Sequence, residues 1–91
     1  MRIVRYSTQF KKDVKRYASM PDKLEALFKI VKYLEQEKPI PSEYKPHRLK
    51  GRLKGCWECH VQSDLLLIWI DESNNIICLE RFGTHSELFK L

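Results

Sequence analysis

The sequence is poor in residues that break or cross-link a chain, with three Gly, four Pro and three Cys among 91 residues. Apolar runs recur along its whole length, so we expect an ordered chain rather than a disordered one. The longest apolar run, residues 65–70, is too short to span a membrane, and residues 1–10 lack the apolar core of a secretion signal. Three cysteines in such a chain do not predict a disulfide framework. These absences favour a folded cytoplasmic protein with no membrane partner.

Positive charge is what the sequence has in excess. Seventeen Lys and Arg oppose twelve Asp and Glu, giving a formal net charge of +5. Clusters of positive side chains attract a polyanion by counterion release, although a run of charges can also be only a solvated face of the protein. The larger group occupies residues 45–54, which contain no acid: Lys45, Arg48, Lys50, Arg52 and Lys54. The smaller group is Lys11, Lys12, Lys15 and Arg16. The charge therefore nominates a nucleic acid as partner, and the length allows one domain over residues 1–91.

The first half of the chain predicts one strand and two helices. Residues 2–6 have the pattern of a short strand, and Ser7 and Thr8 then offer N-cap chemistry for a helix. A second helix should open at Pro21-Asp22, where Asp22 and Glu25 have capping-box spacing, and end near Lys38. The apolar face of the first helix is expected to carry Phe10, Val14, Tyr17 and Ala18. The core stripe of the second is Leu24, Leu27, Phe28, Val31 and Leu34.

The second half changes to the period of β-strands. Residues 56–62 alternate as a half-buried strand does, residues 65–70 form a continuous apolar strand, and residues 76–81 return after a turn at 71–75. Thr84 and Glu87 have capping-box spacing, so a short helix should begin at about His85. The predicted class is α+β with the order β-α-α-β-β-β. We expect an antiparallel sheet packed on an N-terminal helix hairpin, with a short C-terminal helix.

Metal or haem chemistry at the cysteines is a weak alternative. Cys56-Trp-Glu-Cys59-His60 matches the C-x-x-C-H pattern of covalent haem attachment, and Cys56, Cys59, Cys78 and His85 could be drawn as a zinc set. On an alternating strand, however, Cys56 and Cys59 point to opposite faces and do not converge on one ion. Small buried hydrophobic side chains are the better interpretation. We expect no metal and no cofactor.

Histidines and carboxylates offer a different chemistry. His47 lies in the basic segment, His60 shares a strand face with Glu58, and His85 opens the last helix, while Asp64 follows His60 closely. Taken singly, each His can be an ordinary surface residue. Together they would form a general acid–base site for an anionic substrate. RNA cleavage needs a base for the ribose 2′-OH, cations for the phosphorane and an acid for the leaving 5′-oxygen, and it requires no metal.

Two further side chains lie near this set in the sequence. Arg81 could be a surface charge or a clamp on the scissile phosphate, for which its planar guanidinium is suited. Phe89 could pack the last helix or offer a platform on which a splayed base stacks. Both are candidates for the RNA site.

Three stretches of sequence carry a resemblance to a known family. They are His47-x-Leu-x-Gly51, then Lys54-Gly-x-x-Glu58-x-His60-Val-x-x-Asp64-x-Leu-Leu-Ile68, and Arg81-x-Gly-Thr-His85-Ser-Glu-Leu-Phe89. The chain resembles the YafQ branch of the RelE/ParE toxin superfamily over essentially its whole length. The resemblance implies a RelE-like fold and a type II toxin that cleaves mRNA in the ribosomal A site without a metal, held inactive by a cognate antitoxin. It implies His85 as the leading catalytic acid or base, completed by His47, His60 and Asp64, with Glu58 a further candidate, Arg81 on phosphate and Phe89 on a base.

The sequence departs from similar toxins at three positions and leaves two other functions open. Such toxins usually carry Trp at position 53, Arg at 57 and often Pro at 63, where this chain has Leu53, Trp57 and Ser63. Loss of the arginine would weaken phosphate binding unless Lys54 or Arg52 substitutes for it, although Lys cannot reproduce a bidentate fork. A ParE-like toxin that binds DNA gyrase and cuts nothing shares the fold, and a non-catalytic RNA-binding regulator would use only the basic faces. Neither alternative needs the His/Asp set.

Overall fold

The structure, a computed structural model, describes residues 1–73 and 75–89, without the side chain of Arg52. Along the chain lie β1 (Ile3–Tyr6), α1 (Thr8–Arg16), α2 (Pro21–Glu35), β2 (His47–Arg48), β3 (Cys56–Gln62), β4 (Leu65–Ser73), β5 (Ile76–Thr84) and α3 (His85–Phe89). Two 3₁₀ turns, Ser42–Tyr44 and Gly51–Leu53, flank β2. This is the α+β class predicted from the sequence.

The strands form one five-stranded sheet in the order β1-β5-β4-β3-β2. Neighbouring strands are antiparallel except β1, which runs parallel to β5 with Ile3 opposite Ile76. The sheet is therefore mixed, whereas we predicted an antiparallel one. A parallel pair needs a long connection between its strands, and here everything from α1 to β4 provides it. Nothing local in residues 2–6 indicates that direction.

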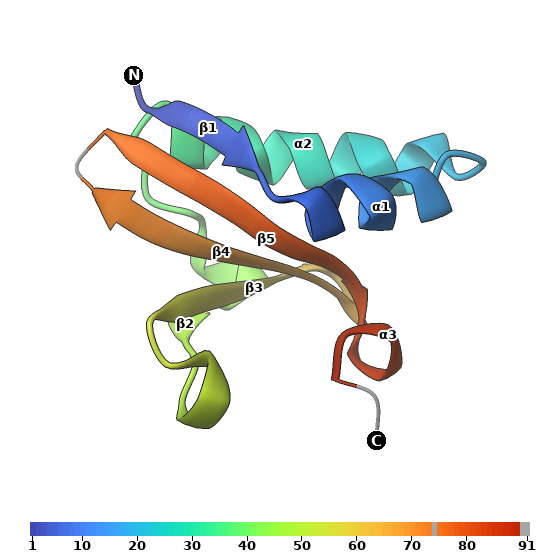
Figure 1. The fold of residues 1–91 in the computed structure, drawn as a ribbon. Coiled ribbons are helices and arrows are strands. Elements are labelled where there is room, and N and C mark those ends of the chain that lie inside the picture. Colours follow the sequence, from blue (N-terminus) through green and yellow to red (C-terminus); the bar gives the residue numbers. More distant parts are fainter. Residues whose placement is uncertain (74, 90–91) are drawn as a thin grey trace.

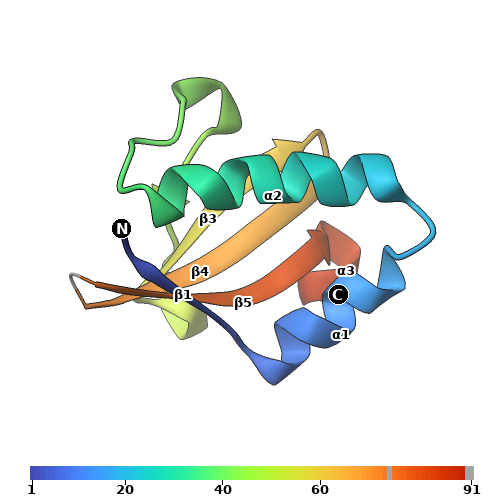
Figure 2. The ribbon, with the colours of Figure 1, turned by 90° about the horizontal axis from the view of Figure 1, so that it is seen from above.

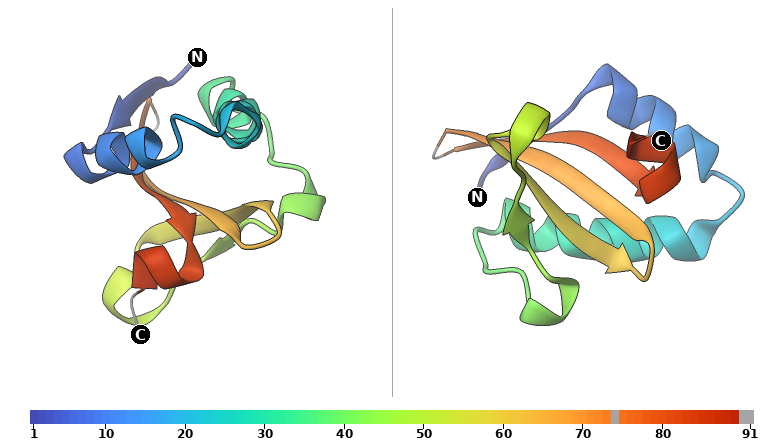
Figure 3. Two further views of the ribbon diagram at one scale, coloured as in Figure 1. Left: turned by 90° about the vertical axis from the view of Figure 1, so that its right-hand side faces the viewer. Right: turned by 90° about the horizontal axis from the view of Figure 1, so that it is seen from below.

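Different helices lie on the two faces of the sheet, with α1 and α2 on one side and α3 on the other (Figure 1). Viewed from above, α2 crosses the strands and α1 lies along the β5 edge (Figure 2). Phe10, Leu27 and Phe82 are fully buried in the core between these helices and the sheet. On the opposite side, α3 and the segment around β2 sit over the strands, where Leu66 and Ile68 of β4 are buried (Figure 3). The second side is the one that carries the histidines.

The helix ends follow the predicted chemistry in one case and depart from it in the other. Ser7 caps α1 by accepting a hydrogen bond from the Phe10 backbone N–H, as predicted. The predicted Asp22 capping box of α2 is wrong: the N-cap is Met20, which makes no side-chain cap bond, and Asp22 lies inside the first turn. The helix also ends at Glu35 rather than near Lys38, because Glu37 adopts a left-handed conformation with φ 59°.

The strands of the second half are longer than the sequence indicated. Residues 56–62 form β3 as predicted, but β4 continues to Ser73 and β5 to Thr84. Asp71 pairs with Ile77, so most of the turn predicted at 71–75 is strand, and its residue 74 lies outside the described residues. The two-residue strand β2 was not predicted. It pairs His47 with Glu58 of β3, which matters for the site.

Candidate active site

Three histidines line up on the side of the sheet that carries α3. His47 comes from β2, His60 from β3 and His85 from the start of α3. Their ring centroids are 6.3 Å apart for His47 and His60, and 6.2 Å apart for His60 and His85. The predicted gathering of these side chains therefore exists in the structure, with His60 at its centre.

Asp64 orients His85. Its Oδ1 lies 2.5 Å from His85 Nδ1 and also accepts the His85 backbone N–H at 3.4 Å. The hydrogen bond from His85 holds the pKa of the Asp64 carboxyl below its usual value, so the group is a carboxylate at neutral pH. A carboxylate on Nδ1 fixes the tautomer, which leaves His85 Nε2 free to face a substrate.

A backbone carbonyl orients His60. Its Nδ1 lies 3.3 Å from the carbonyl oxygen of Ser63 in the β3–β4 turn. A carbonyl only accepts, so Nδ1 carries a proton and donates it, and Nε2 is the ring nitrogen left for a substrate. The register between β3 and β4 shifts between His60 and Gln62, and such bulges re-aim side chains near functional sites. His60 thus has the form that a general base needs.

His47 is held at both of its ring nitrogens. Nδ1 lies 2.8 Å from the Lys45 carbonyl oxygen, and Nε2 lies 3.2 Å from Glu58 Oε1. Both partners are acceptors when Glu58 is ionised, so the imidazolium form, which donates at both nitrogens, satisfies the site. Glu58 is only 4% exposed, and its Oε2 has no hydrogen-bond partner among the described residues. The contact with Glu58 thus holds the His47 ring between β2 and β3.

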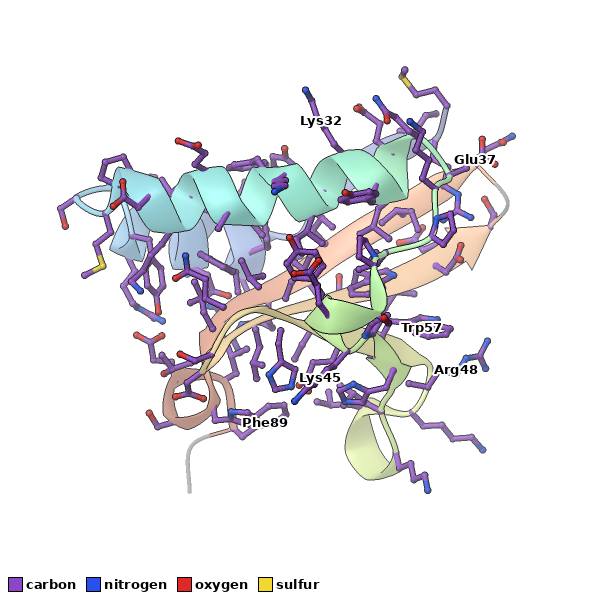
Figure 4. All side chains as sticks on the ribbon, turned by 180° about the vertical axis from the view of Figure 1, so that it is seen from behind. Lys32, Glu37, Lys45, Arg48, Trp57 and Phe89 are labelled. Carbon is purple, nitrogen blue, oxygen red and sulfur yellow. The ribbon has the colours of Figure 1, made fainter. Side chains whose placement is uncertain are left out.

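The helix α3 brings Phe89 to the histidines. The capping box predicted from sequence is present: the Thr84 backbone N–H donates to Glu87 Oε1 at 2.8 Å, and the Glu87 N–H donates to Thr84 Oγ1 at 3.3 Å. One turn later the Phe89 ring centroid lies 5.9 Å from that of His85. Phe89 is half-buried, and Figure 4 shows its side chain beside α3, so part of its ring is exposed.

Arg81 is tied to a residue that the sequence analysis did not single out. Its Nε donates to Asp13 Oδ2 at 2.8 Å and a terminal nitrogen to Asp13 Oδ1 at 3.3 Å. Asp13 is fully buried and also accepts the Phe82 backbone N–H at 2.9 Å. The signal was available, because Asp13 lies three residues after Phe10, on the apolar face of α1. A contact from Arg81 to phosphate can use only the part of the guanidinium that Asp13 leaves open.

The basic segment stays on the surface around β2. Lys45, Arg48, Lys50 and Lys54 are exposed, whereas the side chain of Arg52 lies outside the described residues. The guanidinium carbon of Arg48 lies 5.1 Å from the centroid of the Trp57 ring, and Figure 4 shows the two side by side. Trp57 also stacks on Trp69, in the core on the helix side of the sheet, so it points away from His60. The departure at position 57 is therefore on the other face of the sheet from the histidines.

The cysteines do not form a site of their own. All three are free thiols, and Cys56 and Cys59 are buried. Burial raises the pKa of Cys59 to about 12, so this thiol stays protonated. Within residues 1–73 and 75–89, no three His, Cys, Asp or Glu side chains are arranged as ligands for a metal ion. In the same ranges, no helix is both long and apolar enough to cross a membrane.

The fold and the site define a small basic α+β protein with a histidine–carboxylate cluster on an open face of its sheet. The family model described as "Bacterial toxin of type II toxin-antitoxin system, YafQ" matches residues 2–90. The chain belongs to this YafQ family.

Named relatives agree with this assignment over nearly the full length. The mRNA interferase toxin YafQ of Escherichia coli (strain K12) is 37% identical over 92 residues, covering 97% of this chain and 96% of that protein. The crystal structure of YafQ from E. coli BL21(DE3) superimposes with a TM-score of 0.88 at 33% identity, over 98% of this chain and 99% of that one. In the crystal structure of the E. coli DinJ-YafQ complex, the similar chain has a TM-score of 0.77 at 35% identity and the same coverage.

Proposed function

We propose that this chain is the toxin of a type II toxin–antitoxin system and acts in the cytoplasm as a metal-independent endoribonuclease on mRNA. The ribosomal A site is the place of cleavage that the family suggests. One observation carries the nuclease activity: His60 and His85, with ring centroids 6.2 Å apart, each have Nδ1 engaged and Nε2 open. Two open imidazole nitrogens at this spacing can perform both proton transfers of RNA cleavage.

The hydrogen-bond partners of His60 and His85 suit these residues to different roles, His60 as the base and His85 as the acid. His60 Nδ1 donates to a neutral carbonyl, which suits a neutral imidazole that removes the 2′-OH proton. His85 faces the Asp64 carboxylate, which stabilises an imidazolium that can protonate the departing 5′-oxygen. The 2′-oxygen attacks phosphorus as the bond to the 5′-oxygen breaks. The products are a 2′,3′-cyclic phosphate and a 5′-hydroxyl end.

The remaining candidates stabilise charge or hold the RNA. The His47 imidazolium, held by Glu58, lies beside His60 and can stabilise negative charge on the phosphorane. Phe89 stacks on a base next to His85. Arg81 adds a phosphate contact through the part of its guanidinium that Asp13 leaves open. Backbone phosphates are bound by the basic segment: Lys45, Arg48, Lys50, Arg52 and Lys54.

A cognate antitoxin is the second partner we propose. The E. coli relative is known in complex with its antitoxin, DinJ-YafQ. With a net charge of +5 and a basic segment beside the histidines, an acidic antitoxin segment would cover the surface that binds RNA. Binding of one partner then excludes the other.

The test is to map RNA 5′ ends after induction of the wild type, His85→Ala and the matched control Ser86→Ala, with and without a block of translation. We expect 5′-hydroxyl cuts inside reading frames that require translation, persist in Ser86→Ala and fall at least a hundredfold in His85→Ala. Cuts that persist in His85→Ala would refute the role of His85. Growth arrest without any cut would instead favour a binding target such as DNA gyrase.

A further inference from the structure

The carboxylate of Glu87 fastens α3 to α1. Besides the capping bond from Thr84, Glu87 Oε1 accepts the Tyr17 hydroxyl at 2.5 Å, and Oε2 lies 3.7 Å from a terminal nitrogen of Arg16. Residues 17 and 87 lie at opposite ends of the sequence, and Figure 1 shows α3 below α1, at the end of β5. We call Arg16, Tyr17 and Glu87 the α1–α3 clasp.

The clasp is rigid on the α1 side. Tyr17 is 5% exposed, and its ring centroid lies 5.0 Å from that of Phe82, so packing fixes the direction of the hydroxyl. On the α3 side, Gly83 leaves the space that Glu87 occupies, because a Cβ at this position would stand 2.8 Å from Glu87 Oε1. Both ends of the Tyr17–Glu87 hydrogen bond are therefore positioned by their surroundings.

The ionisation of the two groups agrees with this geometry. Burial, followed by the hydrogen bond to Glu87, raises the pKa of Tyr17 to about 12, so the phenol keeps its proton and donates it. Burial alone would raise the pKa of Glu87, but the hydrogen bonds from Tyr17 and Thr84 outweigh it and hold the pKa below the usual value. The pair is thus a neutral donor with a charged acceptor at neutral pH, one of the stronger kinds of hydrogen bond.

A helix as short as α3 depends on such a contact. Its five residues cannot form a stable helix alone, because isolated helices shorter than about 12 residues are marginal in water. The same helix carries His85, which must stay on Asp64, and Phe89, which must stay beside His85. A misplacement of about 1 Å at reacting groups can cost on the order of a hundredfold in rate.

We propose that Tyr17 is a positioning residue for the cleavage reaction. Through Glu87, its hydroxyl holds α3 where His85 can serve as the acid and Phe89 can meet a base. Tyr17 itself does not touch the RNA in this role. The inference rests on the proposed nuclease function and adds a residue of α1, far from the histidines in sequence, to the parts that set the rate.

The decisive variant is Tyr17→Phe, which keeps the buried ring and removes only the hydroxyl. The matched control is Tyr33→Phe, a half-buried tyrosine of α2 beside Lys32 and Gln36. We expect Tyr17→Phe to cleave mRNA on saturating translating ribosomes about tenfold more slowly in single turnover, with the ribosome concentration for half-maximal rate unchanged. Tyr33→Phe should cleave as the wild type does. Equal rates for Tyr17→Phe and the wild type would overturn the proposal.

A second measurement decides the matter independently of activity. Amide hydrogen exchange of α3, followed by NMR, should speed up at least tenfold in Tyr17→Phe and in Glu87→Gln, while exchange in α2 stays the same. If the wild type itself cuts no RNA, with or without translating ribosomes, the proposed function fails, yet this exchange still tests the clasp. Unchanged exchange in α3 would refute the clasp even if cleavage is slower. Faster exchange throughout the chain would show a general loss of stability and would also refute it.

Discussion

The three histidines have the same side chain, and what each one can do follows from the atoms around it. His60 faces a backbone carbonyl, His85 faces a carboxylate, and His47 lies between two acceptors, and the roles proposed for them rest on these differences. Glu58, which pairs with His47, is buried, and its Oε2 lacks a hydrogen bond among the described residues. A buried and incompletely satisfied carboxylate costs stability.

Glu58→Gln should therefore separate activity from stability. The neutral amide no longer holds His47 as a cation, so the cleavage rate should fall roughly tenfold to a hundredfold. The buried charge is removed at the same time, so the free energy of unfolding should stay equal or rise by up to about 1 kcal/mol. Single-turnover cleavage and urea unfolding measure the two quantities, and Glu25→Gln, on the exposed face of α2, is the matched control. A loss of rate that only follows a loss of folded protein would contradict the role.

At the scale of single residues, hydrogen bonds between neighbours in the sequence could be predicted, whereas hydrogen bonds to residues far away in the sequence could not. Thr84 and Glu87 form the capping box that their spacing indicates, because both ends of that motif lie within four residues. Tyr17 was predicted only as part of the apolar face of α1, and nothing near it in the sequence points to Glu87. The same holds for Asp13, whose partners Arg81 and Phe82 are on β5.

At the scale of elements, α1 connects the two ends of the chain. It packs along β5 and contacts α3 through the clasp, so it supports the strand and the helix that carry Arg81 and His85. Buried Asp13 makes the central contact with β5, accepting from the Arg81 side chain and the Phe82 backbone. An interior carboxylate with this many donors is stable only while all of them are in place.

Asp13→Ala should lower the free energy of unfolding by roughly 3–5 kcal/mol, because it leaves Arg81 and a buried backbone N–H without their acceptor. Asp22→Ala, an exposed carboxylate in the first turn of α2, should cost less than about 1 kcal/mol. Urea unfolding at neutral pH measures both. A cost for Asp13→Ala no larger than that for Asp22→Ala would show that the Asp13–Arg81 contact adds little to the fold.

Which elements could be predicted depended on how much of their structure is local. Periodicity indicated both long helices and strands β3 to β5, since each has enough residues to show its pattern. The pairing of β1 with β5 and the two-residue strand β2 are set by contacts with other strands, and no pattern in two residues can show them. The site depends on β2, because its pairing with β3 places His47 opposite Glu58.

The whole molecule presents its positive charge on two different surfaces. Residues 50–54 of the basic segment follow β2 on the side of the sheet that carries α3, whereas Arg48 lies over Trp57 on the helix side, and Lys11 and Lys12 are exposed on α1. Sequence alone assigned both groups to nucleic acid, because charge counts carry no information about faces. The fold separates residues 50–54 from Lys11 and Lys12, whereas Arg16 of the smaller group reaches α3 through Glu87.

Salt dependence should distinguish these two surfaces. Each phosphate neutralised on single-stranded RNA contributes about 0.7 to the slope of log K against log salt. The double variant Lys50→Ala/Lys54→Ala should therefore reduce the slope by roughly 1.4, and Lys11→Ala/Lys12→Ala should leave it unchanged, although both remove two positive charges. Fluorescence anisotropy with a 2′-O-methyl oligonucleotide measures binding without cleavage, since the attacking hydroxyl is blocked. A reduced slope only in the α1 variant would place the RNA across the helix side and separate RNA binding from the histidines. Equal reductions of the slope in both variants would mean that net charge, and not a defined binding path, attracts the RNA.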